Sequence, residues 1–150
     1  MNMKVRLLFL LLTISLCCFL QTSCTINGKL VQKSEVETLS EKIWTYSQSH
    51  PDGFTLDIRT MTEPTEGIAV SYSATQGSHS RKRLNYVVRH ALRHDGYVGG
   101  WLNTADSLYY FDSTRLFPED SLDVAIRFGI ENGQNSIYSI AGKREISLIK

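Results

Sequence analysis

The chain has 150 residues, of which 42% are hydrophobic and 21% are charged, and this composition excludes both a disordered and a fibrous protein. The length predicts one domain. From Cys24 onward the chain holds 14 basic and 15 acidic residues, a net charge of −1. Because so balanced a charge gives no general attraction to polyanions, we expect no nucleic-acid partner.

Residues 1–23 have the three parts of a secretory signal peptide. Lys4 and Arg6 supply positive charge, residues 7–20 form an apolar run of fourteen residues, and small or polar residues follow. A membrane-spanning helix needs about 20 apolar residues, so this run is too short for one. The sequence therefore predicts a signal peptide at 1–23, with an uncleaved membrane anchor as the alternative.

Cys24 is the only cysteine outside the apolar run, so the processed chain cannot form an internal disulfide. Its position directly after that run resembles the lipid-modified cysteine of bacterial lipoproteins. Thr22 and Ser23 match the lipoprotein motif, whereas Gln21 stands where an aliphatic residue is usual. The resemblance implies a lipid anchor at Cys24, with the membrane as partner on the periplasmic or outer side of the cell envelope. A secreted soluble protein is the alternative.

After a tether at 24–33, we expect a domain at 34–150. A capping box at Ser34 and Glu37 opens a helix that should end near His50. Its apolar residues recur at helical spacing: Val36, Leu39, Ile43 and Tyr46. Alternating segments at 54–59 and 68–72 then predict two strands, joined as a hairpin with a long connection.

Caps at 78–80 begin a second helix, which the Asp95-Gly96 pair should stop. Its apolar stripe consists of Leu84, Val87, Val88, Ala91 and Leu92. Residues 97–103 and 107–113 predict a second hairpin. A third helix should begin at 118–121, end at Gly133, and bury Leu122, Ala125, Ile126, Gly129 and Ile130. Strands at 137–140 and 145–149 close the domain.

This order, α-ββ-α-ββ-α-ββ, predicts a single α+β domain. Paired strands between helices favour a mostly antiparallel sheet of about six strands, with three helices on one face.

The segment Tyr97-Val98-Gly99-Gly100-Trp101 is the most unusual in the chain. Two glycines inside a strand cost stability and often mark the close approach of a ligand or of another backbone. Alternation places Tyr97, Gly99 and Trp101 on one face, with Asp112 as the nearest polar group on the neighbouring strand. This pattern predicts a shallow binding site for a sugar ring or an extended peptide. The alternative is that a helix packs over the glycines and Trp101 belongs to the core.

His90 and His94 are four residues apart on a predicted helix, so their rings can lie side by side. Such a pair can hold a metal, but Ala91 stands where a zinc protease has its catalytic glutamate. The other interpretation is a basic helix C-terminus that complements the helix dipole. Arg89 and Arg93 on the same helix can bind a phosphate, a carboxylated glycan or an acidic partner, or can simply face solvent. We expect neither a metal nor a cofactor.

A set of short motifs between residues 52 and 140 resembles an uncharacterised small α+β domain of phage and mobile-element proteins. The motifs are Gly53-Phe54-Thr55, Gly67-Ile68-Ala69-Val70, Tyr97-Val98-Gly99-Gly100-Trp101, Tyr109-Tyr110-Phe111-Asp112 and Asn132-x-Gln134. The resemblance implies an α+β fold and assigns no activity or catalytic residue.

The sequence holds no nucleophile elbow, no P-loop and no dinucleotide-binding fingerprint. We therefore expect a non-enzymatic binding domain whose partner is a protein, a peptide or a glycan. The alternative is a small hydrolase or transferase that uses His90, His94 or carboxylates near Trp101.

Overall fold

The computed structural model describes residues 33–149, which belong to one compact unit, Val31–Lys150. The predicted signal peptide, Cys24 and all of the predicted tether except Lys33 lie outside the described residues. Lys33 itself is already helical. Within 33–149, no helix is long and apolar enough to cross a membrane.

Within the described residues, three α-helices and six strands follow one another in the predicted order, and the α+β prediction is confirmed. They are α2 (Lys33–Ser47), β1 (Phe54–Asp57), β2 (Ile68–Ser71), α3 (Arg81–Arg93), β3 (Tyr97–Asn103), β4 (Leu108–Phe117), α4 (Leu122–Glu131), β5 (Ser136–Ser139) and β6 (Arg144–Ser147). Short 3-10 turns, η1 (Ser73–Thr75) and η2 (Glu119–Ser121), precede α3 and α4.

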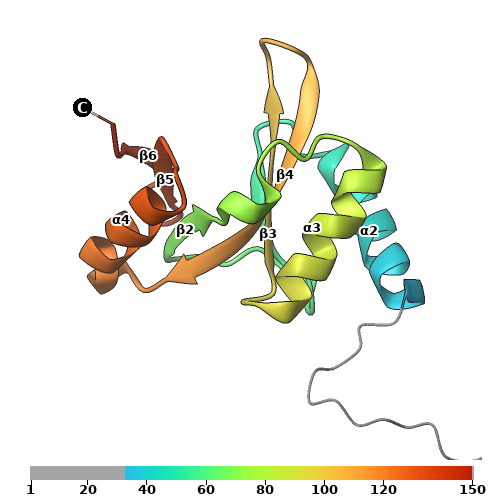
Figure 1. Cartoon of the computed structure of the whole chain (residues 1–150), viewed down its shortest axis with the longest axis horizontal. Coiled ribbons are helices and arrows are strands. Elements are labelled where there is room, and N and C mark those ends of the chain that lie inside the picture. Colours follow the sequence, from blue (N-terminus) through green and yellow to red (C-terminus); the bar gives the residue numbers. More distant parts are fainter. Residues whose placement is uncertain (1–32, 150) are drawn as a thin grey trace, which may run out of the picture. The chain divides into compact units, whose positions relative to one another are not determined.

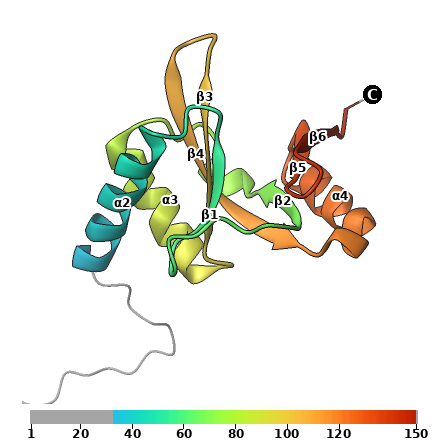
Figure 2. The same cartoon turned by 180° about the vertical axis from the view of Figure 1, so that it is seen from behind.

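The six strands form one antiparallel sheet in the order β1-β3-β4-β2-β5-β6. The predicted β3–β4 hairpin is confirmed and extends away from the helices (Figure 1). The predicted hairpin of β1 and β2 is wrong, because β1 pairs with β3 while β2 lies between β4 and β5 (Figure 2). Alternation identifies a strand and its faces, but it does not name the partner strand.

Several element ends differ from the prediction by a few residues, and three of these differences have a visible cause. Strand β4 continues to Phe117 because its last four residues pair with the whole of β2. Helix α2 ends at Ser47, and residues up to Gly53 form a turn in which the Gly53 amide donates to the His50 carbonyl at 3.1 Å. The start of the third helix is split, because a 3-10 turn follows Pro118 and the α-helix begins only at Leu122.

Two hydrophobic clusters lie between the sheet and the helices. The first packs α2 and α3 against β1, β3 and β4 through residues such as Ile43, Leu56, Leu84, Val88, Val98 and Phe111. The second packs α4 against β2 and β5 through Ile68, Val70, Phe117, Ala125 and Ile137. In α3 the predicted stripe is buried, with Leu92 partly exposed, and Ser80 caps the helix by accepting from the Arg83 amide at 3.3 Å.

Helix α4 buries less than its sequence predicts. Leu122 and Ile130, expected to face inward, are 37% and 60% exposed. The helix approaches the sheet closely along a narrow stripe, since a Cβ at Gly129 would lie 2.6 Å from the Leu148 side chain. Residues on either side of that stripe therefore stay outside the core.

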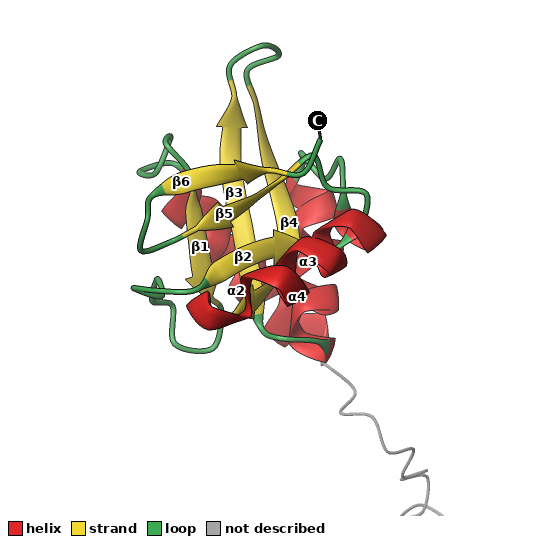
Figure 3. Cartoon of the chain, turned by 90° about the vertical axis from the view of Figure 1, so that its left-hand side faces the viewer, coloured by secondary structure: helices red, strands yellow, loops and turns green. Residues whose placement is uncertain are grey.

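Side chains alternate between the two faces of a strand, so the residues between the core positions point away from all three helices. The sheet is strongly twisted: β2, β5 and β6 run across the view in Figure 3, whereas β1, β3 and β4 run up it. The helix-free face of this twisted sheet is consequently concave.

Candidate functional site: a groove on the helix-free face

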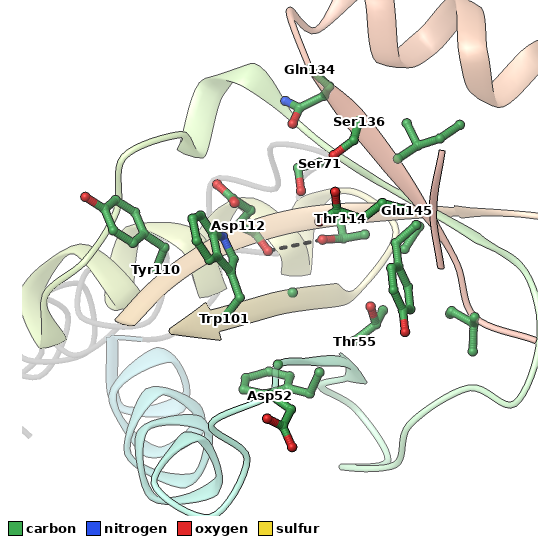
Figure 4. Close-up of a pocket in the computed structure, with 18 of the residues that line it drawn as sticks. Asp52, Thr55, Ser71, Trp101, Tyr110, Asp112, Thr114, Gln134, Ser136 and Glu145 are labelled. Atoms are coloured by element: carbon green, nitrogen blue, oxygen red, sulfur yellow. Dashed lines mark hydrogen bonds between the residues drawn. The ribbon is translucent and has the colours of Figure 1, made fainter. Parts of the chain in front are cut away.

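A groove of about 920 Å³ occupies the helix-free face of the sheet. All six strands contribute to its lining, together with the loops that precede β1, β2, α3 and β5. Figure 4 shows side chains from both halves of the sheet, such as Trp101 and Asp112 on one side and Gln134 and Ser136 on the other, around the same space. A groove of this size can hold a ligand of several rings.

The two consecutive glycines of β3 face opposite sides of the sheet. Gly99 lies on the groove floor, directly between Thr55 of β1 and Asp112 of β4. A Cβ at Gly99 would lie 3.0 Å from Thr114 Oγ1, so the missing side chain lets the Thr114 hydroxyl lie close to the backbone of β3 on the floor. A Cβ at Gly100 would lie 2.7 Å from the Phe54 ring, within the first core cluster. Gly99 therefore shapes the groove, and Gly100 lets aromatic rings pack.

Trp101 forms an aromatic platform at one end of the groove. Its ring is stacked on that of Tyr110, with centroids 5.3 Å apart and planes at 21°, and 48% of the residue is exposed. Tyr110 is fixed in turn, because its hydroxyl donates to Asp106 Oδ2 at 2.8 Å. Tyr97, which the sequence pairs with Trp101, does not line the groove. Tyr110 takes that place because it lies directly opposite Trp101 in the β3–β4 register.

Asp112 of β4 carries a carboxylate on the groove floor, opposite Gly99 of β3. Its Oδ1 atom is buried and has no hydrogen-bond partner among the described residues. Burial raises the pKa of this carboxyl from 3.8 to about 7. An ionisable group in such a position lowers the stability of the fold unless a ligand compensates it, and positions of this kind are concentrated at functional sites.

Neutral hydrogen-bonding groups surround the platform and the carboxylate. They come from four strands and the loop before β5: Thr55, Ser71, Thr114, Gln134 and Ser136 (Figure 4). Sequence reasoning did not find Thr55, Ser71 or Ser136 as site residues. Alternation gives the face of each of them, but only the strand order brings them together.

His90 and His94 lie on the opposite side of the sheet from the groove, in contact with β4. His90 Nδ1 is 2.9 Å from the hydroxyl of Ser113, which points away from the groove because it is adjacent to Asp112. His94 Nδ1 donates to the His90 carbonyl at 2.7 Å, and the two rings stack at 3.9 Å. The structure therefore does not bring His90 or His94 together with Asp112 and Trp101.

The histidines belong to a polar cluster around Asp95. The Tyr72 hydroxyl donates to Asp95 Oδ2, and Arg115 Nε lies 3.9 Å from Asp95 Oδ1. Burial, followed by the nearby charges of His94 and Arg93, lowers the pKa of His90. In the part of the chain that the structure describes, no group of three or more histidine, cysteine or acidic residues is arranged to hold a metal ion.

Arg89 and Arg93 are exposed on α3, which covers the face opposite the groove. The structure therefore does not bring them together with Gly99, Trp101 and Asp112. Any ligand that these arginines bind would occupy a separate surface.

Comparison of the chain with protein families, with curated proteins and with solved structures finds no match. The resemblance to a mobile-element domain stays a prediction, and the groove is the basis for the functional argument.

Proposed function

We propose that this protein is an exported, lipid-anchored, non-enzymatic saccharide-binding protein and that the groove is its binding site. The observation that carries the proposal is the Trp101–Tyr110 platform, which presents a half-exposed indole beside a floor of hydroxyl, amide and carboxylate groups. A sugar ring has an apolar face and a polar rim. An aromatic plane bordered by hydrogen-bonding groups matches both.

A saccharide fits this groove better than an extended peptide does. Peptides that add to a sheet bind through the free main-chain groups of an edge strand. Most strand residues of the groove lining come from β3, β4, β2 and β5, each of which already pairs with a strand on both sides. The floor therefore offers side chains rather than main-chain donors and acceptors, which suits a ligand recognised through hydroxyl groups.

The experiment is a titration of the full-length protein with oligosaccharides, followed by calorimetry. Trp101→Ala should weaken binding about 10- to 100-fold, since stacking on one aromatic ring contributes roughly 1–3 kcal/mol. Trp44→Phe is the matched control, because Trp44 packs on Phe111 in the first core cluster, away from the groove. Equal loss in both variants, or binding that survives in Trp101→Ala, would contradict the proposal.

The location follows from the predicted lipid anchor at Cys24. Such an anchor would hold the groove at the cell envelope, where polysaccharides are abundant. Metabolic labelling with a fatty-acid analogue should mark the wild-type protein, and Cys24→Ala should release it from the membrane fraction. An unlabelled wild-type protein in the soluble fraction would favour the secreted form instead.

A hydrolase is the second candidate function, favoured by one observation. A carboxyl with a pKa of about 7 can donate a proton to a leaving group near neutral pH. If Asp112 has this role, oligosaccharides bound by the wild-type protein should be cleaved, and Asp112→Asn should abolish cleavage. Intact oligosaccharides after prolonged incubation would leave binding as the function of the groove.

A further inference from the structure

We infer that the saccharide bound in the groove carries a protonated amino group, which pairs with the carboxylate of Asp112. This inference rests on the proposed function and names the chemical class of its ligand. The expected ligand is a glycan with free hexosamine units, rather than one with only hydroxyl, acetamido or carboxyl groups.

Within the described residues, Asp112 has no partner that compensates its carboxylate. Its Oδ1 is buried and no donor reaches it. A neutral hydroxyl of a ligand can supply a hydrogen bond to the carboxylate, but it leaves the negative charge uncompensated. An ammonium group supplies both the hydrogen bond and the opposite charge, and buried charges are stable only when both are present.

The residues that line the groove carry mainly negative charge. Asp52, Glu63 and Glu145 line the groove in addition to Asp112, and Lys143 is the only lysine or arginine among the lining residues. Glu63 already accepts a hydrogen bond from the Tyr46 hydroxyl at 2.6 Å, so it contributes charge rather than a free acceptor. A cleft lined mainly by one sign of charge concentrates ions of the other sign. The groove therefore favours a cationic glycan and disfavours uronic or sialic acids.

The distance between the aromatic platform and Asp112 matches the size of a sugar ring. Trp101 and Tyr110 face each other in the β3–β4 register, and Gly99 and Asp112 form the next pair on the same face. Adjacent pairs on one face are two residues, or about 7 Å, apart along a strand. A pyranose stacked on Trp101 consequently extends over Gly99, which has no side chain, and brings one ring substituent to Asp112. Figure 4 shows the carboxylate beside the indole, as this arrangement requires.

The raised pKa of Asp112 gives the inference a pH signature. The carboxyl titrates at about 7 in the free protein, and only its ionised form pairs with an ammonium group. Affinity for an amino sugar should therefore rise as the pH rises through 7, and fall again once the amine loses its proton. A neutral saccharide should show no comparable rise.

The test compares three β-1,4-linked oligosaccharides of equal length by calorimetry on the full-length protein: one of glucosamine, one of N-acetylglucosamine and one of glucose. At pH 7, where the amine and the Asp112 carboxyl are both partly ionised, the glucosamine oligomer should bind at least about 10-fold more tightly than the other two, since hydrogen bonds to charged groups are the stronger class. Between pH 7 and pH 5 its affinity should fall several-fold as Asp112 takes up its proton. Trilysine, which has the charge without the rings, should bind much more weakly than the glucosamine oligomer.

Asp112→Asn should remove the preference, so that the glucosamine and glucose oligomers bind equally. Asp123→Asn is the matched control, because it removes one carboxylate from exposed α4, outside the groove, and should keep the preference. Equal affinity of the three oligomers for the wild type, or a preference that persists in Asp112→Asn, would overturn the inference and leave saccharide binding intact. If none of the three binds, or if trilysine binds as tightly as the glucosamine oligomer, saccharide binding itself is wrong.

Discussion

Asp95 and Asp112 lie on opposite sides of the same sheet and show two different uses of an aspartate. Asp95 receives a hydrogen bond from Tyr72 and has Arg115 as an ion-pair partner, so its charge is compensated within the fold. Asp112 has a buried oxygen without a partner among the described residues and a pKa raised by burial. A compensated carboxylate stabilises a structure, whereas an uncompensated one lowers its stability and is typical of functional sites.

The comparison predicts that removing the charge of Asp112 stabilises the protein. Its folded pKa of about 7 lies above the ordinary value of 3.8, so the folded state holds an extra proton between these values. The free energy of unfolding should therefore fall as the pH rises from 4 to 7. At pH 8, Asp112→Asn should be more stable than the wild type by about 3 kcal/mol in urea denaturation. A variant of unchanged or lower stability would mean that Asp112 is compensated after all.

The two faces should also respond differently to a methyl group in β3. Gly100→Ala places a Cβ 2.7 Å from the Phe54 ring and 2.9 Å from that of Tyr109, and should cost about 2 kcal/mol of stability by overpacking. Gly99→Ala places a Cβ 3.0 Å from the Thr114 hydroxyl, with the Asp112 and Phe54 carbonyls at an ordinary contact distance of 3.9 Å. It should cost less than about 1 kcal/mol but weaken ligand binding. Thermal unfolding and calorimetry of both variants provide the check, and a reversed order would contradict the assigned faces.

On the helix-covered side, the bond from Tyr72 to Asp95 should contribute measurably to stability. The pKa of Tyr72 is raised to about 12, first by burial and then by Asp95, so the hydroxyl remains a donor at neutral pH. Tyr72→Phe should cost about 1 kcal/mol, the usual net contribution of such a bond. Tyr46→Phe removes a similar bond to the exposed Glu63 and should cost less. Equal losses of stability in the two variants would show that the hydrogen bond to Asp95 contributes no more than the exposed bond to Glu63.

The smallest effect expected is the acid sensitivity of His90. Because its pKa is lowered in the folded state, mainly by burial, the unfolded chain takes up the proton more readily. The stabilising contribution is present above pH 6.5 and decreases as the pH falls below it, which is opposite in sign to that of Asp112. The free energy of unfolding that the wild type loses at acid pH should be smaller in His90→Gln by less than about 1 kcal/mol, since the site is partly solvated. Stability measured from pH 5 to 8 in both variants separates the two contributions.

Much of the fold follows from local patterns in the sequence. The α3 stripe, the cap at Ser80 and the stop at Gly96 depend on neighbours a few residues away, and these predictions are confirmed. The pairing of β1 with β3, in contrast, depends on contacts between residues 40 to 46 positions apart. It was missed because nothing local distinguishes it from a β1–β2 hairpin.

The groove was predictable only in part, for the same reason. The unusual glycines and the neighbouring Trp101 and Asp112 mark β3 and β4, which form a local hairpin. Gln134, Ser136 and Glu145 come from segments that reach the groove only because β2 lies between β4 and β5. Tyr97 was misplaced because period-2 alternation gives the face of a side chain but not where along that face the groove ends.

Strand β4 has a consequence for how the domain opens. Phe111 belongs to the first core cluster and Phe117 to the second. Tyr110, Asp112 and Thr114 point to the opposite face of the strand and line the groove. No partial opening that detaches β4 can spare either core. We therefore expect the amide hydrogens of its central residues to exchange only on global unfolding, and a ligand in the groove to slow the exchange of both halves of the sheet together.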